Sequence, residues 1–333
     1  MLVLARNAEE AEEAIDAVAG DAALAHFAKY RLAPPWERRL RRSPRLQREL
    51  SEYIPAPPRV LTNPGSRKRF AIVHTGADFT ILARTNAAYL AAMRDLYALD
   101  VEPGVAFPDD AMRAYWNRWN KGRPYLFLNA PFAAWKRGIE AGFLPSWHRR
   151  MDEAKKRRKI RRGDANTWYV TGKPRFWKRF QRDRRAKAAK LARMRKLKCR
   201  VVERSAELLP LIMQGVDYGG EAKGYLRDCL LLEPSFVCEV AGEPVCWAGT
   251  HLGGSMGMIY TPPEHRRKGY AEALTALQID HMLARDGIAV ANVVLGNRAS
   301  ERLLATFGAK KAPGTVVWRV LRWPRWKYPK LRG

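Results

Sequence analysis

The sequence has no long hydrophobic run, and this absence limits what the protein can be. None of its stretches approaches the roughly 18 uncharged apolar residues of a transmembrane helix. Acidic residues come early, at Glu9, Glu10, Glu12 and Glu13. Secretory leaders instead begin with positive charge and an apolar run, and organellar leaders are poor in acids. We therefore expect a cytoplasmic protein with neither a membrane span nor a leader peptide.

Cysteine is scarce, and its spacing points to no metal or disulfide framework. The chain has four cysteines, with no C-x-x-C pair and no nearby His-x-x-x-His, so we predict no zinc site and no other metal site. Four unpaired thiols are typical of the reducing cytosol. Cys238 and Cys246 lie in predicted strands, and we expect them to be small buried hydrophobic side chains rather than acyl-carrying nucleophiles.

Acidic residues are few relative to basic ones, because 33 Asp and Glu stand against 61 Lys and Arg, for a net charge of +28. Residues 149–200 hold 23 basic and 4 acidic residues, a net of +19, whereas residues 201–318 are nearly neutral with 11 and 13. Residues 319–333 add six basic residues and no acid. Such a surplus favours a polyanionic partner: nucleic acid, the ribosome or an anionic membrane.

The residue pattern predicts an α/β protein with two folded parts, and the 47% hydrophobic content is enough for real cores. A helix is predicted over 8–29, and a hairpin is predicted from 70–74 and 79–83. The predicted divisions are an N-terminal helix with a Pro/Arg-rich segment (1–59), a smaller α/β domain (60–148), a basic helical connector (149–200), a mixed twisted sheet with flanking helices in the order ααβββαβαβ (201–320), and a basic-aromatic tail (321–333).

One strand, loop and helix in the C-terminal part has the features of an anion site. A strand over 255–260 leads into a loop and then a helix that opens at Arg266-Arg267-Lys268-Gly269-Tyr270-Ala271. Backbone N–H groups at a helix start are unsatisfied, carry positive partial charge and suit a diphosphate. The loop has neither G-x-x-x-x-G-K-[ST] nor G-x-G-x-x-G, which excludes a Walker loop and a dinucleotide fingerprint.

This loop resembles the pyrophosphate loop of the GNAT acetyltransferase superfamily, Q/R-x-x-G-x-G/A, with Arg266, Gly269 and Ala271 at its defined positions. The later segment from Asn297 to Phe307-Gly308-Ala309 also resembles that superfamily, and the resemblance covers about 201–320. It implies an acyl-CoA cosubstrate, most simply acetyl-CoA, an amine acceptor and a GNAT-type sheet. The CoA-contacting residues that it implies are Met258, Ile259, Tyr260, Arg266, Arg267, Lys268, Gly269, Tyr270, Ala271, Asn297 and Ser300.

Within the superfamily, the stretches FVCEVAGEPVCW and YTPPEHR look most like the C-terminal domain of glycine N-acyltransferases. Those enzymes carry a degenerate GNAT-like N-terminal half, so the resemblance implies a similar half at 60–148. The chain departs from its relatives at two positions. Leu304 stands where many members have a tyrosine acid, and Ser255 stands near the glutamate that has been proposed as their base.

An alkylammonium group, with a pKa near ~10.4, must lose a proton before it attacks a thioester. The candidates for this task are His251, Tyr260 and Asp217, with Glu221 on the same loop as Asp217; a water-relayed path is an alternative. Backbone N–H groups around Met258–Tyr260 are expected to stabilise the thioester oxygen.

Aromatic residues interleave with basic ones in the connector and in the tail, a pattern that suits stacking on bases and contact with phosphates. A solvated linker and a tail wrapped on the core are the alternatives. The predicted nucleic-acid contacts are Arg157, Arg158, Lys159, Arg161, Arg162, Arg175, Trp177, Lys178, Arg179, Arg184, Arg185, Arg322, Trp323, Arg325, Trp326 and Lys327.

Three functions fit these observations. The first is a CoA-dependent N-acyltransferase whose acceptor amine is carried by nucleic acid, such as a modified DNA or RNA base. The second is the same enzyme acting on a small amine, an amino acid or a protein, with basic arms for localisation only. The third is a nucleic-acid-binding protein whose GNAT-like domain is inactive.

Overall fold

The computed structural model describes residues 3–19, 22–50, 59–63, 69–75, 78–85, 87–92, 125–131, 164–171, 197–203, 205–215, 223–312 and 316–322, with residues 182, 183, 186 and 189. The elements of the N-terminal half are β1 (Val3–Leu4), α1 (Ala8–Val18), α2 (Ala22–Leu32), α3 (Glu37–Arg42), α4 (Pro44–Glu49), β2 (Arg59–Thr62), β3 (Phe70–Thr75), β4 (Asp78–Ala83), β5 (Tyr125–Pro131) and β6 (Asp164–Thr171).

The C-terminal half also begins with helices and strands and contains one long helix, α13. Its elements are β7 (Leu197–Val202), the 3₁₀ helix η1 (Ala206–Leu208), α11 (Leu209–Gly215), α12 (Lys223–Leu232), β8 (Ser235–Val240), β9 (Glu243–Thr250), β10 (Met256–Tyr260), the 3₁₀ helix η3 (Pro263–His265), α13 (Tyr270–Asp286), β11 (Ile288–Val294), α14 (Arg298–Ala305), β12 (Lys310–Lys311) and β13 (Val316–Arg322).

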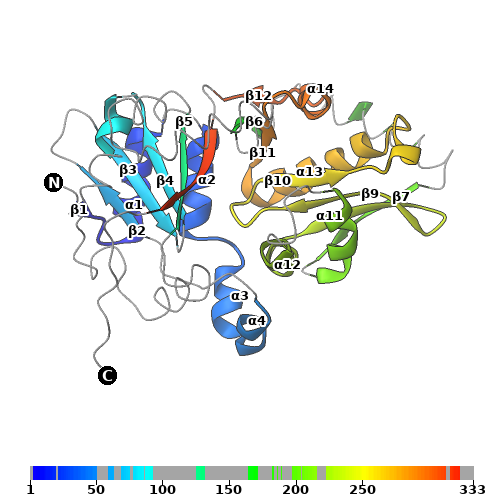
Figure 1. The fold of residues 1–333 in the computed structure, drawn as a ribbon, viewed down its shortest axis with the longest axis horizontal. Coiled ribbons are helices and arrows are strands. Elements are labelled where there is room, and N and C mark those ends of the chain that lie inside the picture. The colour runs from blue at the N-terminus through cyan, green and yellow to red at the C-terminus, as the bar shows by residue number, and fades with distance from the viewer. Residues whose placement is uncertain are drawn as a thin grey trace.

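The strands form one continuous mixed sheet that runs through both lobes seen in Figure 1. The order is β1-β2-β3-β4-β5-β13-β6-β11-β10-β9-β8-β7, with β12 added beside β6. Read from either end, five strands in chain order lead to the centre, and in each half the fourth and fifth strands pair in parallel. The predicted mixed α/β fold with a twisted mixed sheet and flanking helices is therefore confirmed.

The two halves exchange their last strands at the centre of the sheet. β13, from the end of the chain, pairs antiparallel with β5 from Val316↔Pro131 to Arg322↔Tyr125. β6, which follows the N-terminal half, pairs antiparallel with β11 from Ile288↔Thr171 to Val294↔Ala165. Each half of the sheet therefore contains a strand from the other half of the chain, and neither half of the chain forms its part of the sheet alone.

Helices cover both faces of the C-terminal part of the sheet. α13 packs on one face, where Tyr270 and Leu274 meet Phe236 and Cys238 in a buried cluster. α11 and α12 pack on the other, where Ile212 and Leu226 contact a cluster that contains Trp247 and Met258. Glycines with positive φ stand at both ends of α13, Gly269 at 83° and Gly287 at 73°, a conformation that side chains with a Cβ rarely adopt.

The N-terminal helices also pack against the C-terminal half. Trp36, Leu40, Leu46 and Leu50 form a buried cluster with Leu231 and Leu232 of α12. Glu233, which follows that helix, is 1% exposed. Its carboxylate accepts a hydrogen bond from the Tyr30 hydroxyl and another from the Trp36 indole N–H, the latter at 2.9 Å. It also forms an ion pair with Arg285 at 2.9 Å. The buried charge is therefore fully paired. These contacts also attach residues 30–50 to the C-terminal half.

Several predicted elements agree with the structure, and five strands were missed, namely β1, β2, β6, β7 and β12. The hairpin of β3 and β4 is confirmed, and the predicted helix over 8–29 is two helices, α1 and α2. β6 and the first residues of β7 lie inside the segment predicted as a connector. The basic charge of this segment led to its prediction as a connector. Its stretch Thr167-Trp168-Tyr169-Val170-Thr171 is, however, rich in the β-branched and aromatic residues that favour strands. The sequence also predicts helices at 109–121 and 132–140, and both lie outside the described residues.

In the part of the chain that the structure describes, no helix is both long and apolar enough to cross a membrane.

Candidate functional site

The most distinctive feature of the C-terminal sheet is a gap between two parallel strands. β10 and β11 are partners at Met256↔Ala291, and no further pair follows toward their carboxyl ends among the described residues. On its other side, β10 has a register shift between Gly257 and Tyr260 opposite β9. Met258 has a φ of 54°, in the left-handed region. This bulge turns β10 away from β11 and frees backbone groups at Met258–Tyr260 from the ladder between them.

Three glycines make this bulge sterically feasible. A Cβ added to Gly257 would lie 2.5 Å from Nε2 of His251, one on Gly249 would lie 2.7 Å from Sδ of Met258, and one on Gly215 would lie 2.4 Å from Cβ of Tyr260. Real Cβ contacts essentially never reach such distances. No sequence motif distinguishes these three glycines, although Gly257 belongs to the strand predicted over 255–260.

The loop after β10 concentrates positive charge at the start of α13. Arg266 donates from Nε to the carbonyl of Thr261 at 2.9 Å, and its guanidinium lies 5.7 Å from the centre of the Tyr260 ring. Arg267 has a φ of 59° and an exposed side chain. Gly269 caps α13 without a side chain to accept from its first N–H groups. Cationic side chains and helix-start N–H groups are a donor set that fits a diphosphate.

Other predicted CoA contacts are held by the fold in different ways. The side chains of Ile259 and Ala271 are half-buried and pack against the cluster beneath α13, and Tyr270 is buried in that cluster. Asn297 accepts from the Ser300 N–H at 3.2 Å and is the N-cap of α14. Its side-chain oxygen therefore already serves the helix.

His251 lies directly against the bulge. Its Nε2 faces Gly257, and its Nδ1 lies 3.1 Å from the hydroxyl of Tyr225. Burial lowers the pKa of His251 to about 4, because the imidazolium would lose its hydration. At neutral pH the ring is therefore uncharged, which makes it a weak base but a fixed hydrogen-bonding partner for Tyr225.

The remaining catalytic candidates have different outcomes. Tyr260 is half-buried between Gly215 and the ring of Trp247, whose centre is 5.4 Å away. The indole N–H of Trp247 is buried without a hydrogen-bond partner in the structure. Leu304 is buried in the apolar cluster around Ile279 and offers no acid. Asp217 and Glu221 lie outside the described residues.

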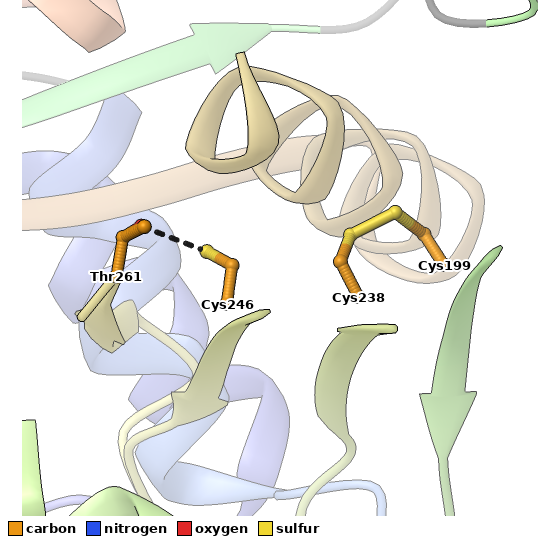
Figure 2. The surroundings of a disulfide bond; sticks show 4 residues. All are labelled: Cys199, Cys238, Cys246 and Thr261. Carbon is orange, nitrogen blue, oxygen red and sulfur yellow. Dashed lines mark hydrogen bonds between the residues drawn. A yellow bond between two sulfur atoms is a disulfide. The ribbon is translucent and has the colours of Figure 1, made fainter. Parts of the chain in front are cut away.

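The cysteine prediction was wrong for two of the four residues. Cys199 on β7 and Cys238 on β8 form a disulfide, with Cα atoms 4.1 Å apart (Figure 2). The two residues are register partners on antiparallel strands. Because β7 was not predicted, no sequence feature indicated that Cys199 and Cys238 would pair. Cys246 is a buried free thiol, as predicted, and so is Cys229.

Two further features lie away from the parted strands. A cavity of about 360 Å³ is lined by Trp36, Glu233, His281 and Arg285 at the far end of α13 from the basic loop. In the described part of the chain, no group of three His, Cys, Asp or Glu could hold a metal ion. Of the predicted nucleic-acid contacts, Arg322 lies in β13; the other fifteen lie outside the described residues.

Comparison with known proteins finds one family match, in the C-terminal half of the chain. Residues 237–319 match the FR47-like protein family model. The matched region contains both parted strands, the basic loop and α13, and covers less than half of the chain. No curated protein sequence matches the chain.

Several solved structures are similar to this chain at low identity. A Drosophila protein is 15% identical with a TM-score of 0.52, and the alignment covers 96% of this chain and 98% of that chain. A tandem GNAT protein from the clavulanic acid biosynthesis pathway is 12% identical (TM-score 0.41, 98% and 100% covered). A GCN5-related N-acetyltransferase-like protein from Streptococcus suis is also 12% identical (TM-score 0.35, 85% and 98% covered). At 15% identity the Drosophila structure shows a common fold alone.

Proposed function

We propose that the protein is an acyl-CoA-dependent N-acyltransferase of the GNAT superfamily, with acetyl-CoA as the donor. The observation that carries this proposal is the parting of β10 and β11 beside a basic helix start, within the FR47-like region. The resemblance of FVCEVAGEPVCW and YTPPEHR to glycine N-acyltransferases supports an amine as the acceptor.

The proposed roles follow from the chemistry of each group. Arg266, Arg267 and Lys268, with the first N–H groups of α13, bind the diphosphate of CoA. The bound cosubstrate supplies an activated acyl group as its thioester. Backbone N–H groups of the bulge at Met258–Tyr260 donate to the carbonyl oxygen that gains charge during attack. Neutral His251 holds the Tyr225 hydroxyl beside this bulge.

For the acceptor, we propose an amine carried by a polyanion, such as a modified DNA or RNA base. Asp164 begins β6, and Ala165 pairs with Val294 at the carboxyl end of β11, beside the gap. In the sequence, the run Arg157–Arg162 ends two residues before Asp164. Its charge would draw phosphates toward the reacting groups.

The cofactor proposal is tested by calorimetry with CoA. The double variant R266E/K268E should bind at least tenfold more weakly than wild type, because it reverses two charges at the loop. R38E/R42E changes the net charge equally on exposed positions of α3 and should leave the affinity unchanged. Wild-type protein that binds no CoA would refute the enzyme and favour an inactive GNAT-like domain.

The acceptor proposal is tested by transfer from radiolabelled acetyl-CoA to amine-bearing DNA, tRNA and free amines. Preferred labelling of the nucleic acids, with a rate that falls steeply with salt, supports the polyanion acceptor. Labelling of free amines alone would refute it and favour a small-molecule acyltransferase, the alternative that uses its basic segments only for localisation.

A further inference from the structure

Three of the four cysteines stand opposite one another on three neighbouring strands. Cys199 on β7 is the register partner of Cys238 on β8, and Cys238 is the register partner of Cys246 on β9. Directly opposite side chains lie on the same face of a sheet, and all three pack in the cluster beneath α13. Figure 2 shows them in this order, with Cys238 in the middle.

This row has the arrangement that thiol–disulfide exchange requires. A thiolate displaces one sulfur of a disulfide by attacking the other, and the attack proceeds from the side opposite the leaving sulfur. Cys246 stands on that side of Cys238. The Cα atoms of Cys199 and Cys238 are 4.1 Å apart, and the ladder between β8 and β9 shifts register directly after the Cys238–Cys246 pair.

A hydrogen bond holds the third thiol away from the disulfide. The Thr261 hydroxyl donates to Sγ of Cys246 at 3.2 Å, and in Figure 2 this sulfur points toward Thr261 rather than toward Cys238. The carbonyl of Thr261 accepts from Nε of Arg266. Thr261 therefore contacts both the free thiol and the basic loop.

We propose that Cys199, Cys238 and Cys246 form a thiol–disulfide exchange site in which the bond moves between Cys199–Cys238 and Cys238–Cys246. Cys246 releases its proton to solvent and its thiolate attacks Sγ of Cys238. The new sulfur–sulfur bond forms as the bond to Cys199 breaks, and Cys199 leaves as a thiolate that takes up a proton. The step is an isomerisation that needs no oxidant or reductant, and it removes the hydrogen-bond acceptor of Thr261 next to the loop that carries Arg266.

The burial of the three cysteines determines how fast the exchange proceeds and which thiol can be detected after it. Burial raises the pKa of Cys246 to about 11, so only about 0.3% of it is thiolate at pH 8.5, and exchange is slow. Cys199 is half-buried on β7, the last strand of the sheet, whereas Cys238 and Cys246 are fully buried. The thiol released by exchange is therefore the most accessible of the three.

The test is a disulfide map of the full-length protein, purified without reductant, incubated at pH 8.5 and quenched with an alkylating reagent. Cleavage after glutamate separates Cys238 from Cys246 at Glu239, so each bridge gives its own peptide pair in mass spectrometry. We expect the Cys238–Cys246 pair to grow over hours, together with alkylated Cys199.

Two cysteine variants complete the test. C199S in a glutathione disulfide buffer should form the Cys238–Cys246 bridge, and C229S should behave as wild type, because Cys229 lies in the cluster on the other face of the sheet. Only Cys199–Cys238 peptides at all times in wild type, with unbridged thiols in oxidised C199S, would overturn the proposal. The map does not involve CoA, so its outcome is independent of the proposed enzymatic function.

Discussion

The half-buried imidazole of His251 predicts how the stability of the protein depends on pH. Its pKa is lowered from 6.5 to about 4 by burial, while in the unfolded chain it returns to about 6.5. Between these values the unfolded state binds more protons than the folded state, so acid favours unfolding. The stability linked to this residue is fully present above pH 6.5 and is lost as the pH falls toward 4.

The size of the effect follows from the shift. A difference of about 2.5 pKa units, at about 1.36 kcal/mol each, gives roughly 3 kcal/mol. The substitution H251Q removes the titration but keeps an amide that can hydrogen-bond to the Tyr225 hydroxyl. The free-energy difference between wild type and H251Q should therefore change by roughly 3 kcal/mol between pH 7 and pH 4, in the sense that wild type loses stability faster.

The assay is urea unfolding of both proteins, followed by tryptophan fluorescence at half-unit steps of pH. Comparison with H251Q cancels the other titrating groups, since they are common to both chains. Two stability curves that run parallel from pH 7 to pH 4 would refute the reasoning, because they would show that His251 titrates alike in the folded and unfolded chain.

Three further predictions concern packing and assembly. G257A should destabilise the protein by about 1–3 kcal/mol in thermal unfolding, because its Cβ would lie 2.5 Å from Nε2 of His251; an unchanged midpoint would contradict the close packing. L40A should cost about 2–5 kcal/mol in urea, because Leu40 is fully buried, and a smaller loss would mean that this N-terminal cluster packs loosely. Residues 197–333 alone lack β6 and the partner of β13 and should aggregate; a monomer that melts cooperatively would contradict the strand exchange.

The local elements of the C-terminal half were predictable because their signals are local. Two strands joined by Ala241-Gly242, with positive φ at both residues, form a hairpin because few other turns suit that sequence. The helix that starts after Gly269 follows from a glycine before a run of helix-forming residues. The basic loop could be located for the same reason, since its charge and its helix start are adjacent in the chain.

The strand exchange could not be predicted in this way. β6 lies between two basic runs and has no local turn that pairs it with a neighbour. Its partner β11 is more than a hundred residues later in the sequence, and such pairing depends on the whole sheet. The same reason explains the disulfide, because Cys199 and Cys238 are separated by 39 residues and meet only through strand register.

The mixed α/β class, the uneven charge and the basic helix start can be read from the sequence, because each depends on residues that are neighbours in the chain. The parting of β10 from β11, the packing of His251 against Gly257 and the row of three cysteines across three strands appear only in the folded chain. Those features depend on which side chains share a face and which strands are adjacent, and packing across the sheet fixes both.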